Sequence, residues 1–124
     1  MPRILVVDDD PAVRGAILRA LERKGHEVRL AATGLEGARL WRDAPADLVV
    51  LDIHMPEMDG IELLVQLRSL NPTVPILMVS GGSQTHRYDL LRDARLLGAT
   101  AELKKPFSLS EFYTVVERLL ALRS

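Results

Sequence analysis

Five side chains able to do chemistry stand at the ends of short apolar runs in this sequence: Asp8, Asp9, Asp10, Asp52 and Ser80. The runs cover residues 4–7, 48–51 and 76–79, and their β-branched composition is typical of buried parallel strands. In an open parallel sheet, function collects at the carboxyl ends of the strands, so we expect these groups to meet at one edge. Because carboxylates that lie close together resist ionising at the same time, we expect this site to bind a cation.

A plainer interpretation, that these acids favour the positive end of a helix dipole, accounts for only one residue of the first acidic cluster. Asp10 is accounted for as a cap at the positive end of a helix dipole, and one cap needs only one acceptor. That leaves Asp8 and Asp9 unexplained, and carboxylate oxygens completed by water suit Mg²⁺. Asp52 alone would be a turn residue that ends a strand, but beside this pair it is a candidate nucleophile or a third metal ligand.

Two further groups have plain alternatives as well. Ser80 could be a turn hydroxyl, and Lys104-Lys105 could be a solvated pair of lysines. Together with the carboxylates, however, they lie at the ends of four different predicted strands. Mg²⁺ and one lysine would supply three positive charges against three carboxylates. A site neutralised in this way could accept a phosphoryl group, whose transfer mainly needs positioning and charge neutralisation.

The segments between these groups alternate between strand and helix patterns. Strands are predicted at about 3–8, 27–31, 47–51, 76–80 and 100–104. Helices are predicted to begin at Asp10 with Pro11, at Thr33, at Asp59, at Thr85 and at Ser108. The pairs Thr33 with Glu36 and Ser108 with Glu111 match the capping-box pattern. The inward faces of the third and last helices are predicted to hold Ile61, Leu64, Leu67, Phe112, Val115, Val116 and Leu119.

Five β/α units in this order predict an α/β fold, with a parallel sheet and helices on both of its faces. The 124 residues suit one domain, which we expect to cover residues 1–124. A net charge of −1, with acids and bases intermixed, gives no electrostatic case for binding nucleic acid or an anionic membrane. The chain has no cysteine, no signal-peptide pattern and no apolar stretch long enough to span a bilayer, so a cytoplasmic location is the simplest expectation.

Four motifs occur in order along the chain: ILVVDDD at 4–10, LDIHMPEMDG at 51–60, MVSGG at 78–82 and KKPF at 104–107. With all four at these separations, the chain resembles a response-regulator receiver domain of two-component signalling over essentially its full length. The resemblance implies a flavodoxin-like, doubly wound (βα)5 fold with five parallel strands in the order 2-1-3-4-5. It also favours a stand-alone, single-domain response regulator.

The resemblance implies Mg²⁺ as the cofactor and indicates its ligands. Asp9 matches the direct ligand of the family's acidic pair, and Asp8 matches the partner that acts partly through water. Asp52 would bind the metal as well, and the backbone carbonyl of His54 would complete the metal shell. The side chain of His54 has two open interpretations: it shields or orients attacking water, or it is a surface imidazole.

Asp52 also matches the family's phosphoacceptor. Ser80 matches the hydroxyl residue that contacts the phosphoryl group, and Lys105 matches the family's lysine, which typically forms a cis peptide bond with Pro106. The implied donor is a phosphohistidine on a sensor histidine kinase or phosphotransfer protein, and phosphorylation would switch a surface for an unknown downstream protein. Such a chain catalyses its own phosphorylation and dephosphorylation, but it is a signalling switch and not a metabolic enzyme.

Two departures from the family pattern concern the output: the residue at position 102, and the region from Ser80 to Gly98, which is longer than the common pattern. Glu102 stands three residues before Lys105, where the family usually has Tyr or Phe, so the usual aromatic switch is missing. Because a carboxylate resists burial in an apolar pocket, we expect segment 81–88, which begins with two glycines, to respond to phosphorylation instead. Glu102 also favours an alternative function, a pseudo-receiver that binds partners without phosphate. A flavodoxin-like cofactor binder or a phosphohydrolase lacks support, because no glycine-rich phosphate loop follows the first strand and no second catalytic acid stands two residues after the candidate nucleophile Asp52.

Overall fold

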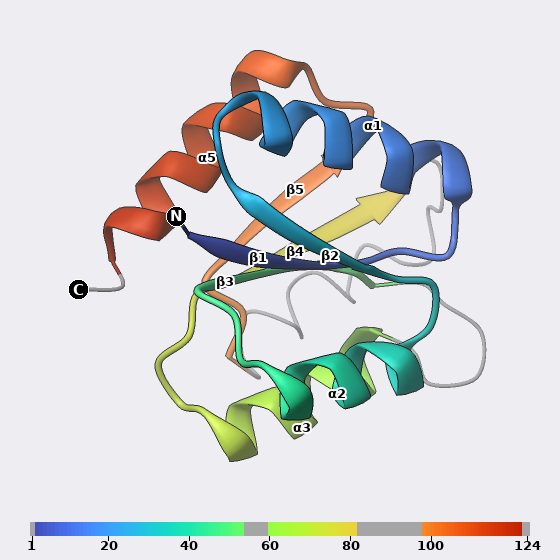
Figure 1. The fold of residues 1–124 in the computed structure, drawn as a ribbon, viewed down its shortest axis with the longest axis vertical. Helices are drawn as coiled ribbons and strands as arrows, with labels where there is room; N and C mark the ends of the chain where they lie inside the picture. Colours follow the sequence, from blue (N-terminus) through green and yellow to red (C-terminus); the bar gives the residue numbers. More distant parts are fainter. Residues whose placement is uncertain (1, 54–59, 82–97, 123–124) are drawn as a thin grey trace.

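Five parallel strands form one sheet in the computed structural model of this protein, in which residues 2–53, 60–81 and 98–122 are described (Figure 1). They are β1 (Arg3–Val7), β2 (Glu27–Ala31), β3 (Leu48–Asp52), β4 (Ile76–Gly81) and β5 (Ala101–Lys105). The strand order is β2-β1-β3-β4-β5, and each neighbouring pair is parallel. The predicted flavodoxin-like order is therefore confirmed.

Helices cover both faces of this sheet. The helices among the described residues are α1 (Pro11–Arg23), α2 (Gly34–Asp43), α3 (Gly60–Leu70) and α5 (Leu109–Ala121). In Figure 1, α1 and α5 lie on one face of the sheet, and α2 and α3 lie on the other. The predicted helix over 85–97, the segment beyond Gly81, the cap at Asp59 and the metal ligand at His54 fall outside the described residues.

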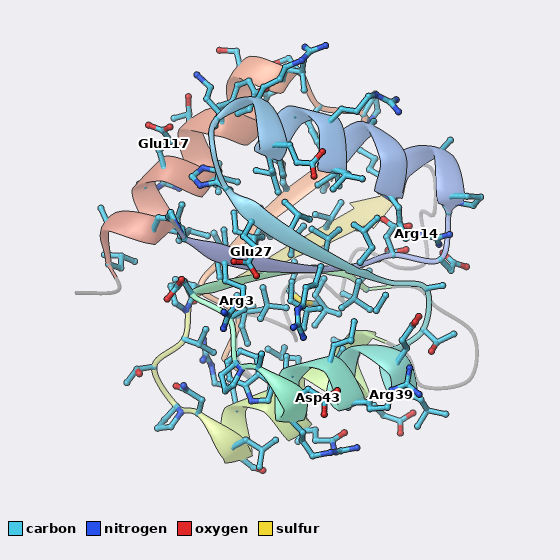
Figure 2. The ribbon with its side chains drawn as sticks, viewed as in Figure 1. Arg3, Arg14, Glu27, Arg39, Asp43 and Glu117 are labelled. Atoms are coloured by element: carbon cyan, nitrogen blue, oxygen red, sulfur yellow. The ribbon has the colours of Figure 1, made fainter. Side chains whose placement is uncertain are left out.

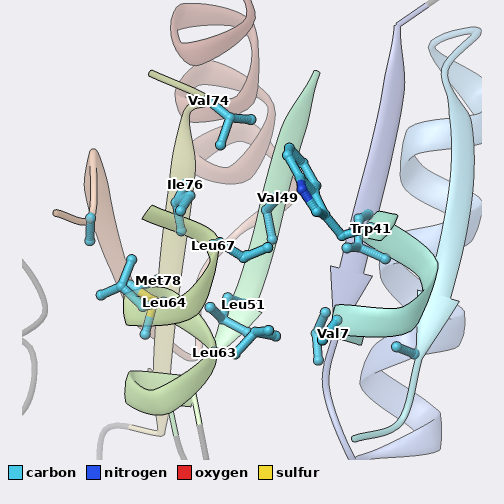
Figure 3. Packing of buried hydrophobic residues seen from close by; sticks show 14 of the residues in the cluster. Val7, Trp41, Val49, Leu51, Leu63, Leu64, Leu67, Val74, Ile76 and Met78 are labelled. Atoms are coloured by element: carbon cyan, nitrogen blue, oxygen red, sulfur yellow. The ribbon is translucent and has the colours of Figure 1, made fainter. Parts of the chain in front are cut away.

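Each face of the sheet has its own hydrophobic core. Figure 3 shows the core beneath α2 and α3, where Leu63, Leu64 and Leu67 pack against the sheet. The strands serve both cores, since Val6 belongs to the α1 and α5 side and its neighbour Val7 to the other. Each fully buried aliphatic side chain contributes about 1.5–3 kcal/mol relative to exposure, so these runs hold the sheet rigidly behind its carboxyl edge.

The predicted inward face of α3 is confirmed, since Leu64 and Leu67 are buried in the core and Ile61 packs against it, and the structure adds Leu63. Ile61 is half-buried, whereas Leu63, which was not predicted to face inward, is fully buried. The buried stripe begins at Gly60 and continues at the spacing of one helix face, which leaves Ile61 at its edge. Val115 of α5 lies at the edge of its stripe in the same way and is also half-buried.

Three predicted helix starts are confirmed, at Asp10, Thr33 and Ser108. Asp10 is the N-cap of α1, its side chain accepts a hydrogen bond of 2.9 Å from the backbone N–H of Ala12, and Pro11 is the first helical residue. Ser108 and Glu111 form a complete capping box at the start of α5, with both hydrogen bonds at 3.0 Å. The first of these caps fixes the turn that carries the acidic residues.

The start of α2 differs in one bond from the predicted capping box. Thr33 caps the helix and accepts a hydrogen bond of 3.1 Å from the backbone N–H of Glu36. The Glu36 carboxylate, however, accepts from the N–H of Ala32 at 2.8 Å. Ala32 follows the last residue of β2, so its N–H lies just outside the sheet, where this carboxylate provides an acceptor.

Four of the five strands differ from their predicted ranges by a single residue, at one end or at both. Asp8 lies just beyond β1, whereas Asp52 and Lys105 are the last residues of β3 and β5. Strand ends of this kind are uncertain by a residue or two from any pattern. The consequence is that Asp52 and Lys105 start from backbone that the sheet holds in place. No helix in the described part of the chain is long and apolar enough to cross a membrane.

Candidate functional site

The ends of β1 and β3 lie level with each other at the carboxyl edge of the sheet. Val7 pairs with Leu51 in the parallel register. The next residues along these two strands are Asp8 and Asp52, so the register brings their backbones side by side. Both side chains are buried, with 2% of Asp8 and 5% of Asp52 exposed. Two carboxylates thus enter the protein interior at neighbouring points.

The ends of β4 and β5 continue the same edge. Asp52 pairs with Val79, which places Ser80 one residue further along β4. Gly81 pairs with Lys105, the last residue of β5. Ser80 is buried, with 5% of its surface exposed. The four strand ends that the sequence predicts to share one edge therefore do so, with the hydroxyl and the lysine beside the carboxylates.

Asp8, Asp9 and Asp52 form a cluster whose carboxylate oxygens can all lie within 4.8 Å of one another. Asp9 is the exposed member, and the other two are buried. Oxygen donors of this kind suit a hard cation, and one exposed side leaves room for waters. The donor set therefore fits Mg²⁺, which binds few protein ligands and keeps several waters.

Lys105 compensates part of the negative charge of this cluster. Its Nζ donates a hydrogen bond of 3.0 Å to Oδ2 of Asp8, and the side chains of Lys105 and Asp8 are 24% and 3% exposed. Oδ1 of Asp8 accepts a hydrogen bond of 2.9 Å from the backbone N–H of Asp10. A buried carboxylate that is paired and hydrogen-bonded on both oxygens is stable in place. Lys105 also forms the cis peptide bond with Pro106 that the resemblance implies.

Arg14 of α1 reaches the same edge and was not among the predicted site residues. Its Nη1 donates a hydrogen bond of 2.8 Å to the backbone carbonyl of Asp8. Figure 2 shows Arg14 at the end of α1 that lies beside the end of β1. The sequence carries one signal of it, a basic residue just after a helix start that opposes the helix dipole, but this signal does not indicate which group the side chain contacts.

Gly60 is the second residue of this site that the sequence reasoning missed. It begins α3, and its backbone N–H donates a hydrogen bond of 3.3 Å to the carbonyl of Ile53. A Cβ at this position would lie 2.7 Å from Cα of Ile53 and closer still to the carbonyl oxygen of Asp52. Only glycine lets α3 begin this close to the end of β3.

Glu102, the departure on β5, is half-buried and pairs with Met78 of β4. It lies three residues before Lys105 on the strand at the end of the sheet order. The expected response of segment 81–88 stays a prediction, because that segment beyond Gly81 is outside the described residues.

Comparisons with known proteins agree with this geometry. A family model described as "Response regulator receiver domain" matches residues 4–117. The response regulator MprA of Mycobacterium sp. (strain KMS) is 42% identical over 118 residues, which cover 95% of this chain and 50% of that protein. The chain thus spans about half the length of the curated relatives it matches.

Solved structures of similar shape have lower sequence identity. The receiver domain of NtrX from Brucella abortus superposes with a TM-score of 0.89 at 32% identity, covering 95% of this chain and 98% of that one. The chemotaxis protein CheY4 of Vibrio cholerae superposes with a TM-score of 0.86 at 30% identity, covering 96% and 98%. Both likenesses extend over nearly the whole chain.

Proposed function

Because this chain belongs to the response regulator receiver domain family, we propose that it accepts a phosphoryl group on Asp52. The donor would be a phosphohistidine on a sensor histidine kinase or on a phosphotransfer protein. One observation carries the proposal: the carboxylates of Asp8, Asp9 and Asp52 gather at one edge of the sheet, and Lys105 is bonded to Asp8. This arrangement combines a nucleophile with the groups that neutralise charge around it.

In the proposed reaction, a carboxylate oxygen of Asp52 attacks phosphorus in line with the departing imidazole nitrogen. The oxygen–phosphorus bond forms as the nitrogen–phosphorus bond breaks, and the imidazole keeps the bonding electron pair. Hydrolysis later transfers the phosphoryl group to water, which releases inorganic phosphate and restores the carboxylate. The signal is reset by this second step.

The remaining residues of the site would stabilise the charge on the transferred group. Ser80 donates a hydrogen bond to a phosphoryl oxygen, and Lys105 supplies a positive charge beside it. The ligands proposed for Mg²⁺ are Asp9, Asp52, the backbone carbonyl of His54 and, through water, Asp8. When bound, this ion supplies charge neutralisation that the side chains alone do not complete.

We expect the substitution Lys105→Met to slow phosphorylation on the order of 100-fold, because loss of one donor aimed at developing negative charge typically has that effect. The rate is measured by intact mass after timed incubation with Mg²⁺ and phosphoramidate. Lys104→Met is a matched control, because Lys104 is exposed on the same strand and carries the same charge. Equal rates for the two variants would refute the role of Lys105.

We expect Asp9→Asn to weaken Mg²⁺ binding at least tenfold, since even groups behind the direct ligands are typically worth about 10–100-fold in affinity. Asp10→Asn is the control, because asparagine caps a helix about as well as aspartate and removes the same charge one residue away. Amide chemical shifts followed during a Mg²⁺ titration give both affinities. Full phosphorylation of the wild-type protein in excess EDTA would contradict a metal-dependent reaction.

The output of the switch would be a changed surface for a downstream protein. MprA is about twice as long as this chain, so a stand-alone regulator, like the cytoplasmic location, stays a prediction. Glu102 supports the alternative of a pseudo-receiver, because a half-buried carboxylate replaces the aromatic group of the family pattern. The two functions differ in one result: a pseudo-receiver keeps its mass unchanged when Mg²⁺ and a phosphodonor are present.

A further inference from the structure

We propose that Arg14 is a positioning residue for the metal site, acting on Asp9 through the backbone of Asp8. Arg14 is half-buried on α1, and its Nη1 donates a hydrogen bond of 2.8 Å to the carbonyl oxygen of Asp8. The inference rests on the function proposed above, in which Asp9 is a direct ligand of Mg²⁺. The inference adds Arg14 to the site as the group that holds the ligand Asp9 in place.

The bond to Asp8 acts on Asp9 because the peptide unit is planar. The carbonyl of Asp8 and the N–H of Asp9 belong to one rigid plane, so a donor that holds this carbonyl fixes where the backbone of Asp9 begins. Asp9 is also the exposed carboxylate of the cluster. An exposed side chain keeps more rotational freedom than a buried one, and it gains most from a fixed backbone.

Arg14 completes a set of bonds around the turn that carries the carboxylates. Oδ1 of Asp8 accepts from the backbone N–H of Asp10 at 2.9 Å, and the Asp10 side chain in turn caps α1. Arg14 lies one helical turn beyond Asp10, and its side chain reaches back to the Asp8 carbonyl. The turn is therefore tied to the first helix at both its side chains and its backbone.

Two effects of Arg14 on metal binding have opposite signs, which makes the proposal testable. A fixed positive charge near the cluster repels a cation, so a purely electrostatic role predicts tighter Mg²⁺ binding once the charge is removed. A positioning role predicts weaker binding, because groups that orient metal ligands are typically worth about 10–100-fold in affinity. The direction of the change separates the two roles.

The experiment compares Mg²⁺ affinity, from amide chemical shifts, in wild type, Arg14→Met, Arg14→Lys and Arg19→Met. Arg19 is an exposed residue of the same helix, about 140° around its axis from Arg14, so its variant makes the same charge change on another side. We expect about a tenfold loss in Arg14→Met, by the typical size of such orienting contacts, and no change in Arg19→Met. Lysine keeps the charge and can donate to a carbonyl, so Arg14→Lys should recover most of the loss.

A second readout uses the protein without metal. Nitrogen-15 relaxation of the Asp9 amide should show greater mobility in Arg14→Met than in wild type, with Arg14→Lys close to wild type. Unchanged or tighter Mg²⁺ binding in Arg14→Met, or an equal loss in both Arg14 variants, would overturn the proposal. Failure of phosphoryl transfer would instead refute the proposed function, because neither readout involves the phosphodonor.

Discussion

The variant Asp52→Asn should gain no phosphoryl group when it is incubated with Mg²⁺ and acetyl phosphate, whereas the wild-type protein gains one, a mass increase of about 80 Da. The amide of asparagine is not a nucleophile, so the proposed oxygen–phosphorus bond cannot form. Intact-mass measurement shows the difference directly. Fragment masses should place the added group on Asp52 in the wild-type protein.

This loss should not result from unfolding. Asp52 is 5% exposed and lies beside Asp8 and Asp9, so the substitution removes one of several like charges that repel one another. We expect the Tm of Asp52→Asn without metal to equal or exceed that of the wild type. Asp47→Asn is the control, because Asp47 lies just before the first residue of the same strand and its Oδ2 accepts from the backbone N–H of Arg3, a role that an amide oxygen can keep. Full phosphorylation of Asp52→Asn would refute the assignment of Asp52 as the phosphoacceptor.

The sequence predicted the layers of the fold well because they follow from local patterns. The run at 48–51 is apolar throughout, as expected for a strand that is buried on both faces. In the structure, every residue of this strand is buried. Caps such as Asp10 and Ser108 depend on neighbours within three residues, so their bonds could be expected. The strand order, in contrast, came from the resemblance to a family, since periodicity does not say which strands are neighbours.

The residues of the candidate site also differ in whether local sequence patterns or distant contacts determine their positions. Asp8 and Asp52 could be placed at one edge because each ends a predicted strand, and the register then brings them level. The bond between Lys105 and Asp8 joins residues 97 positions apart, and its geometry depends on the complete sheet. Arg14 could not be placed with them, because a helix pattern does not show which backbone carbonyl a long side chain will reach.

Gly60 shows how a backbone contact can be missed by local patterns, even though the residue is the last one of the motif at 51–60. From its neighbours, Gly60 is predicted only to begin a helix after Asp59, and nothing local requires glycine at this position. In the structure, the first turn of α3 packs onto the backbone at the end of β3. A Cβ added at Gly60 would lie 2.7 Å from Cα of Ile53 and even closer to the carbonyl oxygen of Asp52. Backbone atoms cannot rotate away as the end of a side chain can. Any substitution must therefore move α3 or the strand that carries the proposed nucleophile.

We accordingly expect Gly60→Ala to lower the free energy of unfolding by roughly 3 kcal/mol, the upper part of the range for overpacking, and Tm by on the order of 10 °C. Gly15→Ala is the matched control and should act in the opposite direction. Gly15 lies inside α1, where a Cβ would approach only the end of the flexible Arg19 side chain, at 3.4 Å. Alanine in a helix interior is favoured over glycine by about 0.5–1 kcal/mol, so this variant should be more stable than wild type.

The same contact links stability to the chemistry of the site. Because the nearest atom to the added Cβ in Gly60→Ala is the carbonyl oxygen of Asp52, we expect the folded variant also to be phosphorylated more slowly than wild type. The rate is compared at a temperature where circular dichroism shows both proteins to be folded, which separates this effect from unfolding. Gly15→Ala, whose change lies on α1, should keep the wild-type rate. A Gly60→Ala protein as stable as wild type would show that α3 can retreat from the strand end without cost, and the close approach would then have no role in holding Asp52.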